Sequence, residues 1–179
     1  RFFGLKRISS EEFLNYTGDD NVYVHLDTAD YYKRKSDRGF DKSEFYKNPE
    51  IYNSVLNDYV SQCDIYLACH LWKSGNPVLL TKSDLQEPNH RCEVIADISC
   101  DIDGPIAATI KATTISTPFY GYDRNSGQEV DWKEPQSIMM MTIDNLPCEL
   151  PRDASEDFGQ ELINSVIPAL LKENDPMIE

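Results

Sequence analysis

The sequence predicts an α/β fold, and three observations support this prediction. Apolar runs of strand length alternate with helical stretches along the chain. Three of the five apolar runs are continuous rather than alternating, which is typical of parallel strands that are covered on both faces. Several helical stretches begin at residues that can cap a helix. We therefore expect a parallel sheet with flanking helices.

The expected strands are short and lie throughout the chain. They are Val22 to Leu26, Ile65 to Leu71, Val94 to Ser99, Thr109 to Ile115 and Ile138 to Ile143. A polar segment from Tyr120 to Gln136 interrupts them, and its Asn125-Ser126-Gly127 favours a turn, so we expect a loop or hairpin there.

Two internal helices are predicted from their start signals. Asn48 followed by Pro49 suits the beginning of a helix, and Ile51, Val55 and Tyr59 then recur every four residues, which predicts one packed helix. Thr81 and Asp84 predict a second, shorter helix, because the hydroxyl can accept from a free amide of the first turn.

The last helix has the strongest pattern. Asp153 and Glu156 have the spacing of a capping box. An apolar stripe recurs every four residues, at Phe158, Leu162, Val166 and Leu170. Pro168 should kink or cap the final turns, because proline supplies no amide to the helix.

Charge and cysteine content restrict the partners and the compartment. The chain has 17 basic and 31 acidic residues and a formal charge of -14, which disfavours nucleic acid and anionic lipid surfaces. No apolar run approaches the ~18 residues that a membrane span needs. Five cysteines without a C-x-x-C pair indicate buried free thiols in a reducing compartment, and we expect the cytosol.

The start of the chain suggests a fragment. It opens at Arg1, and RFFGLKRIS is typical of the end of a helix running into a strand.

Ligands of open α/β sheets bind beyond the carboxyl ends of the strands, so polar residues there are candidates. DISCDIDG carries Asp97, Asp101 and Asp103 after one strand. A calcium loop would need a glutamate where Ile110 stands, so a turn is favoured over a metal site. Asp144 and Asn145 follow another strand, next to a proline turn. This rigid turn can direct the two side chains into a cleft, or it can have a structural role alone.

The three histidines are candidates of a weaker kind. His70 ends a predicted strand and can act as a proton carrier or as a polar strand terminus, and the structural role is favoured because no triad-like spacing accompanies it. His25 is a similar case, and His90 lies in a predicted loop. The chain has no G-x-G-x-x-G, G-x-x-x-x-G-K-[ST] or G-x-S-x-G motif, so it contains no phosphate-binding glycine loop.

Three segments together resemble one family. They are KSDRGFDKSEFYKNPEIY (35–52), VIADISCDIDGPIAATIKATTISTPFYGYD (94–123) and TIDNLPCELPRDASEDFGQELINSVIPALL (142–171). The segments resemble the lysine-ketoglutarate reductase and saccharopine dehydrogenase family, which is related to alanine dehydrogenase and the transhydrogenase nucleotide domain. The resemblance covers nearly the whole chain from about Ser9 onward.

The resemblance implies a partial Rossmann-like domain over residues 1–179 that lacks its first strand and glycine-rich loop, with residues 152–179 as a C-terminal helix and tail. It implies NAD or NADP as the cofactor, and hydride transfer between nicotinamide and the C–N bond of saccharopine, which joins lysine and 2-oxoglutarate. The cofactor would carry the chemistry while the protein orients it.

The resemblance also implies roles for seven residues. Asp101 corresponds to a strand-end aspartate beside substrate and nicotinamide, and is the catalytic candidate. The cofactor-binding candidates lie at two other strand ends and are Cys69, His70, Leu71, Asp144, Asn145 and Leu146.

The family's catalytic lysine and histidine belong to an amino-terminal domain that we expect to be missing here and to be this chain's partner. The isolated chain should then be inactive, and an exposed sheet edge would favour a homo-oligomer. Two alternatives remain open: a non-catalytic α/β binding or regulatory module, and an alanine dehydrogenase-like enzyme that acts on another small amino acid. Ser9, Ser10, Glu11 and Glu12 leave the choice of NAD or NADP undecided.

Overall fold

The computed structural model describes residues 4–172, which belong to two compact units. The first unit ends at Asp144, and the second begins at Asn145. The helix end expected at Arg1 and the last residues of the expected C-terminal tail lie outside the described residues.

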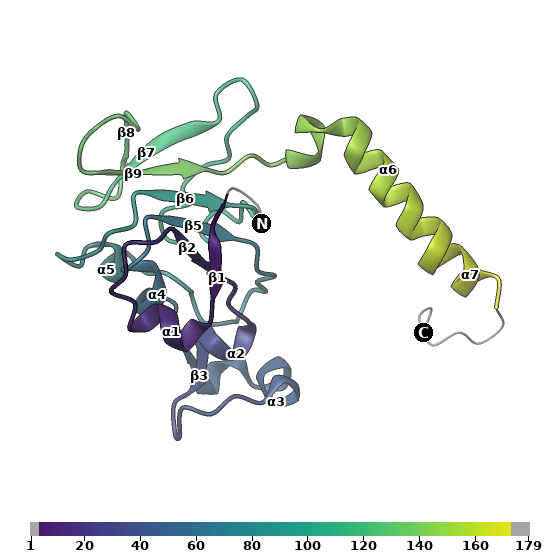
Figure 1. The fold of residues 1–179 in the computed structure, drawn as a ribbon, viewed down its shortest axis with the longest axis horizontal. Helices are drawn as coiled ribbons and strands as arrows, with labels where there is room; N and C mark the ends of the chain where they lie inside the picture. Colours follow the sequence, from purple (N-terminus) through teal and green to yellow (C-terminus); the bar gives the residue numbers. More distant parts are fainter. Residues whose placement is uncertain (1–3, 173–179) are drawn as a thin grey trace. The chain divides into compact units, whose positions relative to one another are not determined.

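The first unit is built around a five-stranded sheet of order β5-β6-β9-β7-β8 (Figure 1). These strands are β5 (Ile65–Ala68), β6 (Val94–Asp97), β9 (Ser137–Met141), β7 (Phe119–Asp123) and β8 (Glu129–Val130). The first three in spatial order are parallel, whereas β7 and β8 run antiparallel to their neighbours. The α/β class is confirmed, but the sheet is mixed.

The region from Tyr120 to Gln136 forms a hairpin, as predicted. Gly127 takes a left-handed backbone with φ of 69°, and Asp123 Oδ1 accepts from the amide of Asn125 at 2.7 Å. This aspartate therefore closes the turn between β7 and β8.

Three of the five predicted strands lie in the main sheet as β5, β6 and β9. The first predicted strand is present as β2 (Val22–Val24), but it pairs in parallel with β1 (Lys6–Ile8) in a separate two-stranded sheet. The predicted strand at Thr109 to Ile115 is wrong. The segment makes only isolated bridges, of which one pairs Thr113 with Ile143. The Thr113 side chain also takes part, since Thr113 Oγ1 accepts from the amide of Thr142 at 3.1 Å.

The single helix predicted after Asn48 is also wrong. The segment instead forms a 3-10 turn η1 (Pro49–Ile51), strand β4 (Tyr52–Ser54) and helix α4 (Asn57–Val60). β4 pairs antiparallel with β3 (Tyr32–Arg34). Tyr52 is 1% exposed and packs edge-on to the ring of Phe45 at 5.3 Å, so strand pairing and aromatic packing outweigh the four-residue periodicity.

The remaining helices of the first unit are short. They are α1 (Ser10–Leu14), α2 (Thr28–Tyr31), α3 (Lys42–Lys47) and α5 (Lys82–Leu85). The helix predicted at Thr81 is confirmed as α5: the Thr81 hydroxyl accepts from the amide of Asp84, whose carboxylate accepts from the amide of Thr81.

The core lies against β6 and β9, and one side of β5 is uncovered. Ile95, Ile138 and Met140 are fully buried, whereas Ile65 and Leu67 are each 62% exposed. Coverage on both faces, which continuous apolar runs predict, is therefore wrong for β5. β5 is an edge strand, and among the described residues no further strand pairs with its outer side.

The second unit is helical. It contains a 3-10 turn η2 (Leu146–Glu149), α6 (Pro151–Glu161), a π-helical turn η3 (Leu162–Val166) and α7 (Ile167–Leu170). The predicted helix is confirmed, but its capping box is wrong because Asp153 lies inside the first turn and Leu150 is the N-cap. The predicted irregularity near Pro168 is present as the π-helical turn just before it.

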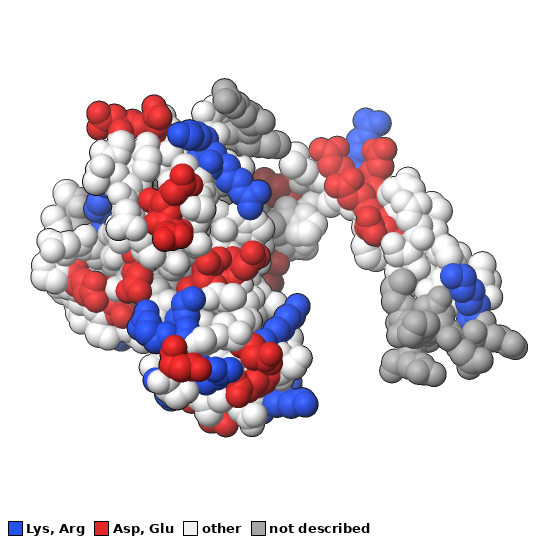
Figure 2. Space-filling model, turned by 60° about the horizontal axis from the view of Figure 1, so that its bottom comes forward, with Lys and Arg blue, Asp and Glu red and all other residues white. Residues whose placement is uncertain are grey.

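Acidic and basic side chains are interspersed on the face of the first unit drawn in Figure 2. Within the described residues, no helix has the length and apolar character that crossing a membrane requires.

Candidate functional site

The carboxyl ends of β5, β6 and β9 lie at one edge of the sheet. Ala68 stands opposite Asp97, and Ala96 stands opposite Met141. The residues that follow these strands therefore meet at the same edge, which is where parallel α/β sheets bind ligands.

Asp97 is the buried centre of this edge. Its side chain is 0% exposed. Ser99 Oγ donates to Oδ1 at 2.7 Å, and Thr109 Oγ1 donates to Oδ2 at 2.6 Å. A buried carboxylate is tolerated because both of its oxygens have donors. Asp97 therefore fixes the turn after β6 to the segment that carries Thr109.

The backbone of that turn is constrained. Cys100 and Asp103 have positive φ values of 54° and 56°, which non-glycine residues rarely adopt. Gly104 is required, because a Cβ there would meet the carbonyl oxygen of Asp101 at 2.6 Å. Backbone of this kind is stored strain and is common at functional sites.

Three carboxylates lie close enough to the Cys100 thiol to influence its pKa. Burial raises the pKa of Cys100 to about 11, and the charges of Asp97, Asp144 and Asp101 add to the rise. Asp101 and Asp144 are both exposed. Asp101 and Asp144 follow different strands, and the structure places both of these predicted residues near Cys100, where the charge is negative.

His70 lies at the same edge, after β5. Burial lowers its pKa, and the charges of Asp97 and Asp101 oppose that shift. The Tyr66 hydroxyl lies 3.4 Å from His70 Nδ1, and Nε2 is buried without a hydrogen-bond partner among the described residues. Burial therefore favours the neutral imidazole, and one of its nitrogens has no hydrogen-bond partner among the described residues.

A hollow of about 330 Å³ opens beside His70. It lies between the ends of β2 and β5, and its lining is mainly aromatic and apolar: Val24, His25, Leu26, Tyr31, Tyr66, Leu67, Cys69 and His70. This volume is at the lower end of the range for small-molecule sites, so it suits one ring-sized part of a ligand.

The sequence reasoning missed Tyr66 and the structural role of Asp97. Strand periodicity could have found Tyr66, because residues 66, 68 and 70 of an extended segment point to the same face. No local pattern links Asp97 to Thr109, which lies twelve residues further along the chain.

Among the other predicted residues, Cys69 lines the hollow, whereas Leu71 is 95% exposed. Asn145 and Leu146 belong to the second unit, where Asn145 precedes η2. The structure therefore gathers Cys69, His70, Asp101 and Asp144 within the first unit.

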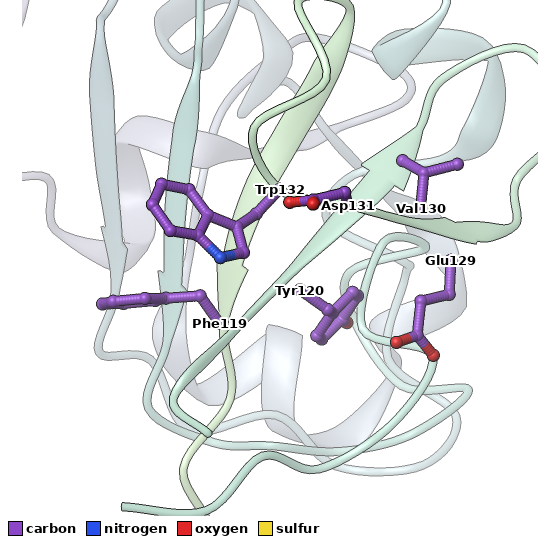
Figure 3. Close-up of a pocket in the computed structure, with 6 residues that line it drawn as sticks. All are labelled: Phe119, Tyr120, Glu129, Val130, Asp131 and Trp132. Carbon is purple, nitrogen blue, oxygen red and sulfur yellow. The ribbon is translucent and has the colours of Figure 1, made fainter. Parts of the chain in front are cut away.

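A second, more open hollow of about 540 Å³ lies along the β7–β8 hairpin (Figure 3). Phe119 and Trp132 meet edge to face there, with ring centroids 6.0 Å apart. Its Glu129 is paired with Lys111 at 2.5 Å. In the spatial order of the sheet, this hairpin is at the opposite edge from β5.

Within residues 4–172, no group of three or more His, Cys, Asp or Glu side chains could hold a metal ion.

Comparison with known proteins identifies relatives of one class. No family model matches the chain. It is 34% identical over 167 residues to the mitochondrial alpha-aminoadipic semialdehyde synthase of Mus musculus, and 32% identical over 129 residues to the alpha-aminoadipic semialdehyde synthase of Arabidopsis thaliana. It is 29% identical over 118 residues to the NAD(+)-dependent, L-lysine-forming saccharopine dehydrogenase of Schizosaccharomyces pombe.

The family predicted from the three segments is therefore confirmed: this chain belongs to the lysine-ketoglutarate reductase and saccharopine dehydrogenase family. The matches cover 82%, 70% and 66% of the chain for the mouse, Arabidopsis and yeast relatives. They cover only 18%, 12% and 31% of those relatives, so the chain corresponds to a small part of each.

Proposed function

We propose that this chain is the nucleotide-binding portion of an oxidoreductase of lysine metabolism. The whole protein would transfer a hydride between a nicotinamide cofactor and the CH–NH bond of saccharopine, the compound of lysine and 2-oxoglutarate. The observation that carries the proposal is the parallel edge of β5, β6 and β9, where His70, Asp101 and Asp144 converge. Family membership supports the same reaction.

Residues 1–179 are proposed to form a partial Rossmann-like domain, with 152–179 as its C-terminal helix and tail. The uncovered β5 supports this assignment, since Ile65 and Leu67 leave an apolar strip where a further strand and helix would pack. The missing strand, the glycine-rich loop and the amino-terminal catalytic domain would then be supplied by the rest of the protein.

The residues present fit part of a nicotinamide dinucleotide. The buried, unpartnered Nε2 of His70 and the adjoining hollow suit one ring-bearing half of such a molecule. When bound, the cofactor supplies the hydride chemistry. Cys69, His70 and Leu71 would contact it from the segment after β5, and Asp144 from the segment after β9. The predicted roles of Asn145 and Leu146 stay predictions. Asp101 would orient the substrate beside it.

We propose NAD rather than NADP. The name of the yeast relative specifies NAD(+). The residues after β1 agree: Ser9 and Glu12 cap α1 with each other, and the neighbouring exposed Glu11 disfavours a 2′-phosphate. Titration of NADH and NADPH against the full-length protein tests this choice.

Activity of the full-length protein tests the main proposal. We expect oxidation of NADH that depends on both lysine and 2-oxoglutarate. Asp101→Asn should lower the turnover about 100-fold because substrate orientation is lost, while NADH binding measured by fluorescence remains. Asp19→Asn is the matched control, since it makes the same charge change at an exposed loop residue. Full activity of Asp101→Asn would reject the assigned role.

The same assays separate the alternatives. Alanine oxidation without lysine or saccharopine activity would indicate the alanine dehydrogenase-like enzyme, and failure of the full-length protein to bind either cofactor would indicate the non-catalytic module. The relatives reported above favour saccharopine. The oligomeric state follows from light scattering of the same preparation.

The compartment is tested separately. Cysteine content favours the cytosol, whereas the mouse relative is named as mitochondrial. Imaging of a fluorescent fusion of the full-length protein distinguishes the two.

A further inference from the structure

Cys63 and Cys92 lie next to each other at the amino ends of β5 and β6. Ile65 stands opposite Val94 in this parallel pair, so extending the register backwards places Cys63 opposite Cys92. The amides of Glu93 and Val94 both donate to the carbonyl oxygen of Asp64, at 3.0 and 3.2 Å. The two cysteines are therefore held on adjacent, hydrogen-bonded segments.

The two thiols influence each other's pKa, and each donates to a nearby carbonyl oxygen: Cys63 Sγ to Val60 O at 3.4 Å, and Cys92 Sγ to Val94 O at 3.3 Å. Cys92 is 0% exposed and belongs to the core, while Cys63 is half-buried at its margin.

This placement suits a disulfide bond. Neighbouring strands lie about 4.8 Å apart. Disulfide-linked residues have Cα atoms roughly 4.4 to 6.8 Å apart, so a bond between these two cysteines needs no rearrangement of the sheet.

The two thiols differ in acidity, which gives them different roles. The interaction with the Cys63 thiol lowers the pKa of Cys92, and the charge of Arg124 acts in the same direction. Arg124 Nη2 donates to the carbonyl oxygen of Cys92 at 2.6 Å, which fixes the guanidinium beside this residue. The same interaction between the thiols, together with burial, raises the pKa of Cys63. Cys92 is therefore the sulfur that ionises first.

We propose that Cys63 and Cys92 are an oxidation site, which hydrogen peroxide converts to an intramolecular disulfide. The Cys92 thiolate attacks one peroxide oxygen, so that the O–O bond breaks, a sulfenic acid forms and one water leaves. The Cys63 sulfur then attacks the Cys92 sulfur, and the S–S bond forms as the hydroxyl leaves as a second water. Two thiols are oxidised by two electrons, and one peroxide is reduced to two waters.

The other three cysteines are less suited to this reaction. Carboxylates and burial raise the pKa of Cys100 to about 11, which suppresses its thiolate. Cys69 is exposed at the carboxyl end of β5, where the sheet register places it opposite Ile98 rather than a cysteine, and Cys148 lies outside the sheet, in the second unit.

Peptide mapping of the oxidised chain tests the proposal. The reduced 179-residue protein is treated with hydrogen peroxide, alkylated, digested without reductant and analysed by mass spectrometry. We expect one linked peptide pair that contains Cys63 and Cys92, and its loss after reduction. Alkylation of both residues after peroxide treatment would overturn the proposal, as would linked peptides spread evenly over other cysteine pairs.

Cysteine-to-serine variants show whether the disulfide forms in the folded protein rather than in unfolded chains. Cys63→Ser should abolish the linked pair and leave a Cys92 sulfenic acid that a dimedone probe captures, whereas Cys69→Ser and Cys148→Ser should leave the pair unchanged. Circular dichroism verifies that each variant is folded. If Cys63→Ser does not fold, urea unfolding of the wild-type chain is the test. The disulfide closes a loop, so the oxidised chain should have a higher urea midpoint than the reduced chain. An equal or lower midpoint would reject a native disulfide.

Discussion

The Asp97 carboxylate has the most demanding environment of any residue at the candidate site. It is fully buried, and its partners are the hydroxyls of Ser99 and Thr109 and the amide of Ser99. Removing a donor from a buried carboxylate leaves a charge with too few partners, and this loss exceeds the ordinary net contribution of a hydrogen bond. The turn after β6 therefore depends on side chains from another part of the chain.

Thr109→Val tests that dependence, because it keeps the shape of the side chain and removes the donor. We expect the free energy of unfolding to fall by roughly 1.5 to 3 kcal/mol in urea titrations. Thr117→Val is the matched control: Thr117 is exposed and, among the described residues, its hydroxyl bonds to the neighbouring Thr114 alone, so the loss should be small. Equal losses in the two variants would mean that the Asp97 contact has no special importance.

Tyr66→Phe tests the contact between Tyr66 and His70. We propose that the Tyr66 hydroxyl is the donor and Nδ1 the acceptor. Because only the neutral imidazole can accept there, removing the hydroxyl should raise the pKa of His70 from its lowered value. NMR titration measures this directly, since the chain has only three histidines to assign. An unchanged His70 titration would show that the hydroxyl does not bond to the ring.

At the scale of elements, local signals were sufficient where the partners are close in sequence. Thr81 and Asp84 predicted α5 correctly because both members of the capping box lie within one turn. Tyr52 to Ser54 was predicted as helix but pairs with β3, because its partners lie about twenty residues earlier in the chain. The strand ends that carry His70, Asp101 and Asp144 could be predicted from apolar runs alone, whereas the hollow beside His70 depends on β2, whose pairing no local pattern reveals.

Two glycines predict opposite responses to the same change. A Cβ at Gly121 in β7 would meet backbone atoms of Asp131 and Trp132 at 2.6 to 2.9 Å, so Gly121→Ala should destabilise the hairpin by about 1 to 3 kcal/mol. Gly159 in α6 has no such neighbour within 4 Å, and Gly159→Ala should increase helicity and stabilise α6 by about 0.5 to 1 kcal/mol. Urea unfolding and far-ultraviolet circular dichroism measure both. Similar effects of both substitutions would contradict the close packing at Gly121.

At the scale of the whole molecule, buried histidines make stability depend on pH. His90 is 6% exposed, and its pKa is lowered by burial and then by Arg124, which donates to the His90 carbonyl oxygen at 2.6 Å. The folded chain therefore binds a proton less readily than the unfolded chain. Stability is fully present above pH ~6.5, the ordinary histidine pKa, and is lost as the pH falls towards the folded value.

His90→Asn measures this contribution. The urea midpoint of the wild-type chain should fall between pH 7 and pH 5, and the fall should be smaller in the variant because one of the titrating groups is gone. His25→Asn is the control for a general effect of replacing a histidine. Parallel pH profiles for wild type and His90→Asn would contradict the role given to His90.

The two edges of the main sheet differ in how much backbone they offer to a further strand. At one end the two-residue strand β8 comes from a tight hairpin, so little backbone is offered for growth there. At the other end β5 offers its full length. In the proposed full-length protein, a strand that pairs in parallel with β5 would end on the same side of the sheet as His70. The loop after that strand would then border the proposed ligand site as well as follow an extension of the sheet.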